Sequence, residues 1–188
     1  IAVMAGVGVG VRRFSAARPE PVIEQLHPVT LPNGETRLWK PDLSAYESSV
    51  VLDANAMPNE AGQYEVGTQT FIRQGDRVYE QFLDESLGKW RIRHPSDTTA
   101  YQPILGSNGR GAWRHTLERP LEWDRLTLLR RLGHETDGFS DAELIRIADV
   151  SGVSDNALRK MHVDHAVPPP ALTDALRLFR ADAGVDEV

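Results

Sequence analysis

Two histidines, His94 and His115, are the side chains of this 188-residue chain whose setting most readily suggests chemistry. Each ends a predicted strand and follows an arginine, Arg93 or Arg114. If they meet in space, or if one of them meets an acid such as Asp97, they could bind an anion or transfer a proton. No serine or cysteine motif stands beside them, and the chain has no cysteine. A hydrolase-type or other catalytic domain that uses His94 or His115 therefore stays open as an alternative.

The same part of the sequence also allows a binding surface without catalysis. Basic side chains gather around the two predicted strand ends, and we name this group the basic rim: Arg91, Arg93, His94, Arg110, Arg114 and His115. Such a group would hold an acidic partner through charge-assisted hydrogen bonds. We favour this binding interpretation, in which no residue is catalytic and no metal or cofactor is expected. His162 and His165 are only two ligands, and a zinc site needs a third.

Residues 140–163 have the outline of a DNA-reading helix-turn-helix, with the stretch "IADVSGVSDNALRKMH" at its centre. Their charge argues against that use. Acids stand at 141, 143, 149, 155 and 164, whereas bases stand only at 146, 159 and 160. Because phosphate neutralisation dominates affinity for DNA, a net negative reader starts at a disadvantage. We predict two helices that pack on each other and keep a helix-turn-helix DNA-binding domain as an alternative.

The composition is that of a soluble globular protein, with 40% hydrophobic and 26% charged residues. The formal net charge of −6 is a second reason not to expect a nucleic-acid partner. The first eleven residues, "IAVMAGVGVGV", are uncharged and mostly apolar, but a membrane-spanning helix needs about 20 such residues. We interpret this run as the end of a longer upstream segment that is buried or associated with a membrane.

The chain divides into five predicted parts. These are a hydrophobic stub (1–17), an extended linker with one short strand at Thr36–Lys40 (18–62), a β-rich unit (63–117), a helical unit (118–182) and a tail (183–188). In the β-rich unit, β-branched and aromatic runs between Gly and Asp turns predict an antiparallel meander at 63–66, 70–73, 77–83 and 89–93. Residues 78–82 alternate in the manner of a sheet that buries one face. Segments 100–105 and 111–116 are expected to add strands, and Trp90 and Trp113 are expected in the core.

Helical periodicity begins after Pro120. We predict helices over 123–132, after a capping box formed by Ser140 and Glu143, after Ser154, and after the three prolines at 168–170. Three acids near the first helix, Glu118, Glu122 and Asp124, are expected to be solvated residues at its N-terminus. The predicted fold class is α+β, with a small antiparallel β-meander or barrel-like sheet followed by a bundle of about four helices.

Several motifs resemble a module of very large secreted proteins of pseudomonads and their relatives. They are W-R-I-x-H-P at Trp90, G-x-G-A-W-R-H at Gly109, P-L-E-W at Pro120 and the tail "LRKMHVDHAVPPPAL". The proteins are the dermonecrotic-toxin-like proteins, many of which also carry leucine-rich repeats and a cysteine-dependent ubiquitin-ligase domain. The similarity covers most of residues 30–182. The ligase activity does not carry over, because it needs a cysteine that this chain lacks.

The resemblance implies a non-catalytic binding or positioning module of a bacterial toxin or effector. Such a protein is secreted by the bacterium and delivered into a target cell. The implied partners are other domains of the same toxin and a host or rival-cell protein, with membrane association through the upstream hydrophobic segment. The resemblance also implies that "SGVSDNALRKMH" belongs to a helical tail of the module.

Overall fold

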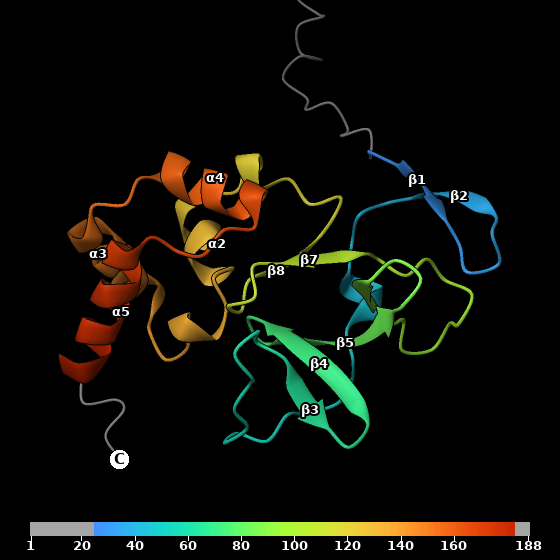
Figure 1. Ribbon diagram of the computed structural model, residues 1–188, viewed down its shortest axis with the longest axis horizontal. Helices are drawn as coiled ribbons and strands as arrows, with labels where there is room; N and C mark the ends of the chain where they lie inside the picture. Colours follow the sequence, from blue (N-terminus) through green and yellow to red (C-terminus); the bar gives the residue numbers. More distant parts are fainter. Residues whose placement is uncertain (1–24, 183–188) are drawn as a thin grey trace, which may run out of the picture.

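The computed structural model describes residues 25–182 (Figure 1). The strands in this range are β1 (His27–Thr30), β2 (Thr36–Trp39), β3 (Tyr64–Val66), β4 (Gln69–Gln74), β5 (Arg77–Asp84), β6 (Lys89–Ile92), β7 (Leu105–Ser107) and β8 (Trp113–His115). The helices are α2 (Arg125–Arg130), α3 (Asp141–Ser151), α4 (Asp155–Asp164) and α5 (Pro170–Asp182), with short 3-10 turns η1 (Ser44–Tyr46), η2 (Pro120–Glu122) and η3 (His134–Thr136). The predicted α+β class is confirmed, and the described strands form open antiparallel sheets and no closed barrel.

The central sheet is a four-stranded meander in the order β3-β4-β5-β6. Its strands pair antiparallel, with Ile72 opposite Tyr79 and Leu83 opposite Trp90. Each strand lies within two residues of its predicted bounds, because short β-branched and aromatic runs between tight turns leave the chain few other conformations.

Both faces of this meander are buried, which corrects the expectation of a sheet with one buried face. On one face Phe71 and Val78 pack with Val50 and Leu52 of the preceding loop. On the other face their neighbours Ile72 and Tyr79 pack against η1, β7 and β8. Alternation in β5 is therefore weak, since Val78, Tyr79 and Gln81 are all buried. The loop that carries Val50 and Leu52 shows no strand or helix signal in its sequence, so the burial of that face could not be predicted.

The stretch before the meander contains a β-hairpin where the sequence predicts one strand in a linker. Strand β2 is the predicted strand, and β1 pairs with it antiparallel, so that His27 faces Trp39. The Trp39 ring makes edge contacts with Tyr46, Tyr101 and His115, at centroid distances of 6.2, 4.9 and 5.6 Å. The hairpin is thereby fixed to η1 and to the end of β8.

Strands β7 and β8 form a second hairpin between the meander and the helices (Figure 1). A bridge between Arg91 and Ile104 joins it to the edge strand β6. Trp113 on β8 is 6% exposed, as expected of a core residue, whereas Trp90 is only partly buried against the same cluster. This hairpin also contacts α4, because the Asn108 amide and the Arg114 guanidinium donate to backbone carbonyls at the end of α4 and just after it.

The helical unit has a core of its own, built from leucines of α2 and the buried faces of α3, α4 and α5. The predicted capping box is present at the start of α3, where Ser140 and Glu143 bond to each other's backbone N–H. Ser154 caps α4 by accepting from the Ala157 N–H, without the reciprocal bond of a capping box. The first helix is shorter than predicted, and it begins after Asp124, whose side chain accepts from the Thr127 N–H.

Three glycines meet where the β-rich and helical units join. A side chain on Gly62 would lie 2.8 Å from Gly111 Cα, and one on Gly133 would lie 2.4 Å from Gly111 O. Gly133 also has φ 107° and ψ −149°, a region open essentially to glycine alone. The two units therefore approach each other backbone to backbone at this seam.

None of the helices within residues 25–182 has the length and apolar character needed to cross a lipid bilayer. The predicted hydrophobic stub (1–17) and tail (183–188) lie outside the described residues.

Candidate functional site

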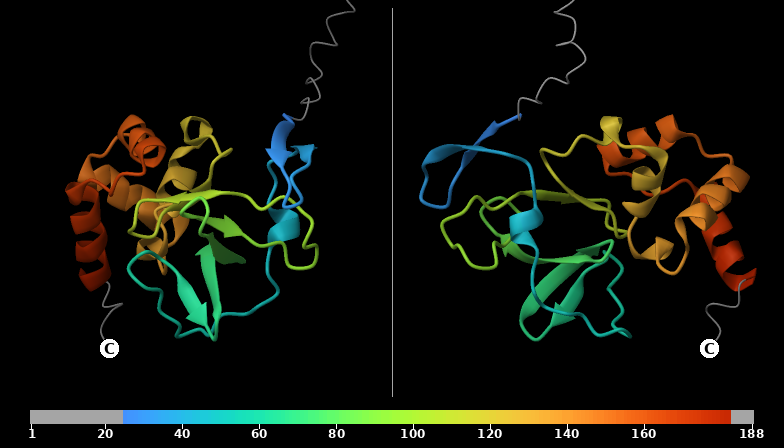
Figure 2. Two further views of the ribbon diagram at one scale, coloured as in Figure 1. Left: turned by 45° about the vertical axis from the view of Figure 1, so that its right-hand side comes forward. Right: turned by 180° about the vertical axis from the view of Figure 1, so that it is seen from behind.

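A cleft of about 610 Å³ lies between the β1–β2 hairpin, the meander and the segment that leads from β8 into α2. The hairpin and the helical unit stand on opposite sides of the molecule in the right-hand view of Figure 2. We name the cleft of about 610 Å³ the His115 cleft. Its polar lining consists of Gln25, His27, Lys40, Asp42, Gln74, Tyr79, His115, Glu118, Arg119 and Glu122, and Trp123 forms part of its wall. A concave site with convergent polar groups is where ligands usually bind.

The floor of the His115 cleft is held by an ion pair between Glu118 and Arg131. Both terminal nitrogens of Arg131 donate to the carboxylate, at 2.8 and 2.7 Å, and the backbone N–H of His115 donates to the same group. The two side chains are only 18% and 15% exposed. Burial alone would raise the pKa of Glu118, but the hydrogen bonds and the charge of Arg131 outweigh burial and hold that pKa below its usual value. Glu118 is therefore an ionised, fully bonded anchor.

His115 is buried on this floor in a defined tautomer. Its Nδ1 accepts a hydrogen bond of 3.2 Å from the backbone N–H of Leu117, so the neutral ring must carry its proton on Nε2. Burial lowers the pKa of His115 and favours the neutral ring, although Glu118 acts in the opposite direction. Within residues 25–182 no group accepts a hydrogen bond from Nε2. The ring can therefore donate a hydrogen bond from Nε2, but its one lone pair, on Nδ1, is already used by the Leu117 N–H.

Tyr79 and Trp123 complete the fixed part of the cleft. Burial raises the pKa of Tyr79, although the neighbouring Arg77 acts in the opposite direction, so the hydroxyl stays protonated and can donate a hydrogen bond. The Trp123 ring has the Arg131 guanidinium 4.5 Å from its centroid and the edge of His162 at 5.1 Å. Two neighbours therefore hold this wall in place before any ligand binds.

The rim of the cleft is charged in both senses and exposed to water. Arg119 pairs with Glu122 at 2.9 Å, and both side chains are more than half exposed. Asp42 accepts from the backbone N–H and the hydroxyl of Ser44, and these hydrogen bonds lower its pKa. Asp42 thus stays ionised at neutral pH, and the exposed charges of the rim can steer a polar ligand toward the floor.

The structure places only one residue of the predicted basic rim, His115, in this cleft. Arg91 pairs with Asp84 at 2.8 Å, Arg93 with Glu80 at 3.4 Å, and Arg110 lies 4.0 Å from Glu60. Arg114 points to the C-terminal end of α4, where it donates to two carbonyls. Within the described residues no hydrogen bond, ion pair or ring contact joins two side chains of the rim. The six residues therefore serve separate parts of the fold.

His94 and His115 are not in direct contact, although a chain of aromatic rings connects them. His94 packs edge-on to Tyr46 at 4.9 Å, and Trp39 contacts both Tyr46 and His115. The Nδ1 of His94 accepts from the backbone N–H groups of Ser96 and Asp97. As in His115, the nitrogen lone pair of the neutral His94 ring accepts from backbone N–H groups.

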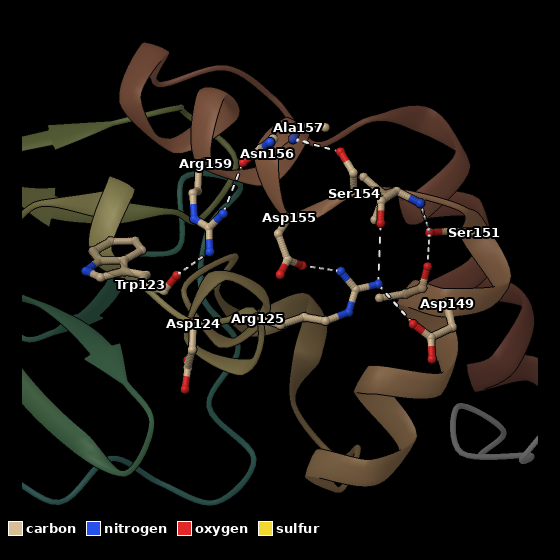
Figure 3. A network of polar contacts seen from close by, with 12 residues as sticks. Trp123, Asp124, Arg125, Asp149, Ser151, Ser154, Asp155, Asn156, Ala157 and Arg159 are labelled. Carbon is tan, nitrogen blue, oxygen red and sulfur yellow. Dashed lines mark hydrogen bonds and ion pairs between the residues drawn. The ribbon is translucent and has the colours of Figure 1, made fainter.

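Ion pairs and hydrogen bonds join the helix-turn-helix stretch to the rest of the helical unit (Figure 3). Arg125 of α2 pairs with Asp155 at the start of α4, with Asp149 at the end of α3, and with the Val153 carbonyl between them. Arg159 donates to the Trp123 carbonyl, and Lys160 pairs with Asp164. The basic groups of α4 thus have partners within the protein. Both helices belong to the core of the helical unit, but they pack on α2 and, for α3, on α5, which corrects the prediction that they pack on each other.

Sequence reasoning missed the centre of the site. Glu118 is the buried partner of Arg131, which corrects its interpretation as a solvated acid at a helix start, while Asp124 does cap α2 as expected. Tyr79 carried no signal apart from its place in a strand. Within the described residues no three His, Cys, Asp or Glu side chains stand close enough to hold a metal ion.

Comparison of the chain with protein-family models, curated proteins and solved structures finds no match. The resemblance to dermonecrotic-toxin-like proteins therefore stays a prediction, and the geometry of the His115 cleft has to be interpreted from its own chemistry.

Proposed function

We propose that this chain is a non-catalytic binding module of a large secreted bacterial toxin or effector, and that it holds its partner in the His115 cleft. The observation that carries the proposal is the hydrogen bond from the Leu117 N–H to His115 Nδ1. A general base needs a free lone pair within reach of the proton that it removes. His115 offers a fixed N–H donor in its place.

The other groups of the floor agree with a binding role. Both oxygens of Glu118 accept from Arg131, so this carboxylate is neither a free base nor a nucleophile. No cysteine is present in the sequence, and the described residues that line the cleft include no serine or threonine that a base could activate. These bonds favour binding over catalysis by His115 or Glu118 at the floor of the cleft.

The floor favours a partner that accepts hydrogen bonds. His115 Nε2 and the Tyr79 hydroxyl are donors, and carbonyl and carboxylate oxygens are the groups in a polypeptide that such donors recognise. A chain segment from another domain of the same toxin, or from a host or rival-cell protein, supplies both kinds of oxygen. We expect that segment to lie across the cleft, with one carbonyl or carboxylate oxygen on the floor.

The setting of the module follows from the resemblance given above. Secretion by a bacterium and delivery into a target cell belong to this proposal, as does association with a membrane through an upstream hydrophobic segment. The alternatives are catalysis at His94 or His115 and duplex-DNA binding by α3 and α4. The hydrogen bonds of both histidines and the internal ion pairs of α4 favour the binding module over either alternative.

The test compares what the wild-type chain and two cleft variants capture from host-cell and bacterial lysates. Tyr79→Phe removes one donor, and Arg119→Glu reverses an exposed charge on the rim. Arg146→Glu is the matched control, because Arg146 is exposed on α3 and does not line the cleft. We expect a partner that the wild type and the control retain and both cleft variants lose. A partner that both cleft variants retain as well as the wild type does would contradict the proposal. Ester hydrolysis that depends on His115 would also contradict it.

A further inference from the structure

A second concave surface, of about 550 Å³, lies where the loop before β3 faces α5. Its lining includes the apolar residues Ala56, Met57, Pro58 and Leu176, and we name it the Met57 groove. It shares no lining residue with the His115 cleft. Its volume is within the range that small-molecule sites occupy.

Met57 is 82% exposed among the residues that line the groove, so its side chain is accessible to a ligand there. Methionine is flexible and polarisable, and it adapts to apolar ligands of different shapes. Covering its side chain would remove apolar surface from water, and this favours a ligand with a hydrocarbon body.

The walls of the groove carry more positive than negative charge. Arg73, Arg177 and Arg180 line it, against the acids Glu135 and Asp137. Arg73 is paired with Asp137, and Arg177 lies 3.6 Å from Asp174 with its side chain 65% exposed. Arg180 donates only to the backbone carbonyls of Glu135 and Asp137, and no carboxylate of the described residues lies within ion-pair distance of it. The α5 side of the groove therefore presents cationic charge to a ligand.

We propose that the Met57 groove binds a small amphipathic carboxylate. Its hydrocarbon chain lies on Met57, Pro58 and Leu176, and its carboxylate lies at Arg177 and Arg180. Guanidinium groups bind carboxylates through paired, charge-assisted hydrogen bonds, so the two arginines select an acid over an alcohol or an amine of the same length. This site is independent of the proposed function, and the failure of one leaves the other intact.

The test follows the methyl groups of ¹³C-labelled methionine while decanoate is added below its micellar concentration. Met57 reports on the groove, and Met161, buried in the helical core, reports on the fold. We expect a saturable shift of the Met57 signal and a constant Met161 signal. Decyltrimethylammonium, which has the same chain and the opposite charge, should bind at least about tenfold more weakly.

Two variants decide whether the charge selects the ligand. Arg177→Glu should weaken decanoate binding by about tenfold or more, because it places a like charge beside the carboxylate. Arg146→Glu makes the same change on an exposed part of α3 and should leave the affinity unchanged. Equal binding of the two amphiphiles, or equal affinity of the two variants, would show an apolar surface without selection. A Met57 signal that never saturates would show that no site exists.

Discussion

Glu118 and Arg131 face each other in a two-pronged ion pair, with N–O distances of 2.8 and 2.7 Å, across the join between the β-rich and helical units. Glu118 follows β8 and Arg131 follows α2, and Arg131 also donates to the Trp113 carbonyl. The pair thus fixes the helical unit to the end of β8, one residue from the Leu117 N–H that sets the tautomer of His115. The order of the cleft floor depends on this contact.

Removing Arg131 should destabilise the protein more than removing Glu118. Arg131→Leu leaves a buried carboxylate without its partner and also removes the bond to the Trp113 carbonyl, which costs about 3–5 kcal/mol. Glu118→Gln leaves a guanidinium that keeps this bond, its contact with the Trp123 ring and the amide oxygen as an acceptor, and it should cost less. Urea unfolding followed by circular dichroism measures both. The exposed pair Arg119–Glu122 is the control, and Arg119→Leu should cost no more than about 1 kcal/mol. Similar losses for Arg131→Leu and Arg119→Leu would show that the buried pair has no special weight.

The glycine seam should tolerate no side chain at Gly133. Gly133→Ala would place Cβ 2.4 Å from Gly111 O in a backbone region that alanine avoids, so we expect a loss on the order of 3 kcal/mol or more. Gly67→Ala is the matched control, because its φ is also positive but nothing lies within 4 Å. That variant should lose only the roughly 1–2 kcal/mol of a left-handed residue. Thermal unfolding of the two variants compares them, and equal losses would mean that the seam can open without cost.

Buried His162 should make the protein less stable in acid. Burial lowers the pKa of His162 from its ordinary 6.5 to about 4, although its bond to the Leu128 carbonyl acts the other way. Between those two values the unfolded chain takes up a proton that the folded chain refuses, so stability falls as pH falls from about 6.5 toward 4. The expected loss is on the order of 3 kcal/mol.

His162→Gln removes this titration and keeps an amide that can donate to the Leu128 carbonyl. Its stability should therefore change less than that of the wild type over the same pH range. Urea unfolding at pH 7, 5.5 and 4 compares the two proteins. Parallel pH profiles would show that His162 takes up its proton with equal ease in the folded and unfolded states.

Duplex DNA should not bind to α3 and α4. Asp155 stands at the start of the would-be reading helix, and Arg159 and Lys160 are engaged with the Trp123 carbonyl and Asp164. Fluorescence anisotropy with a labelled duplex should show no binding at low salt, and replacing both bases by alanine should change nothing. Salt-sensitive binding that the double variant loses would restore the helix-turn-helix alternative.

Local signals predicted the elements of this fold well. Ser140 and Glu143 form the predicted capping box because its two hydrogen bonds involve residues three positions apart. The turns at Gly67, Gly75 and Gly88, which separate the strands of the meander, are likewise set by residues that are close together in sequence. Information confined to a few neighbouring residues was sufficient for these elements.

The candidate site was not predictable in the same way. Glu118 and Arg131 meet across the join of the two units, and nothing near Glu118 in sequence distinguishes it from a solvated acid. Strand β1 was missed because it lies among prolines and is stabilised by β2 and by the contacts of Trp39. The basic rim was predicted from neighbours in sequence, whereas its arginines contact acids and carbonyls on several different elements.

The tautomer of His115 is the most direct test of the binding-module account. A long-range ¹H–¹⁵N correlation spectrum of the imidazole side chains reports which nitrogen carries the proton. We predict a neutral His115 ring with its proton on Nε2 at pH 7, and the same signal after addition of simple ester substrates, which should remain intact. A proton on Nδ1, or a ring that titrates near neutral pH while an ester is hydrolysed, would identify His115 as a general base and contradict the account.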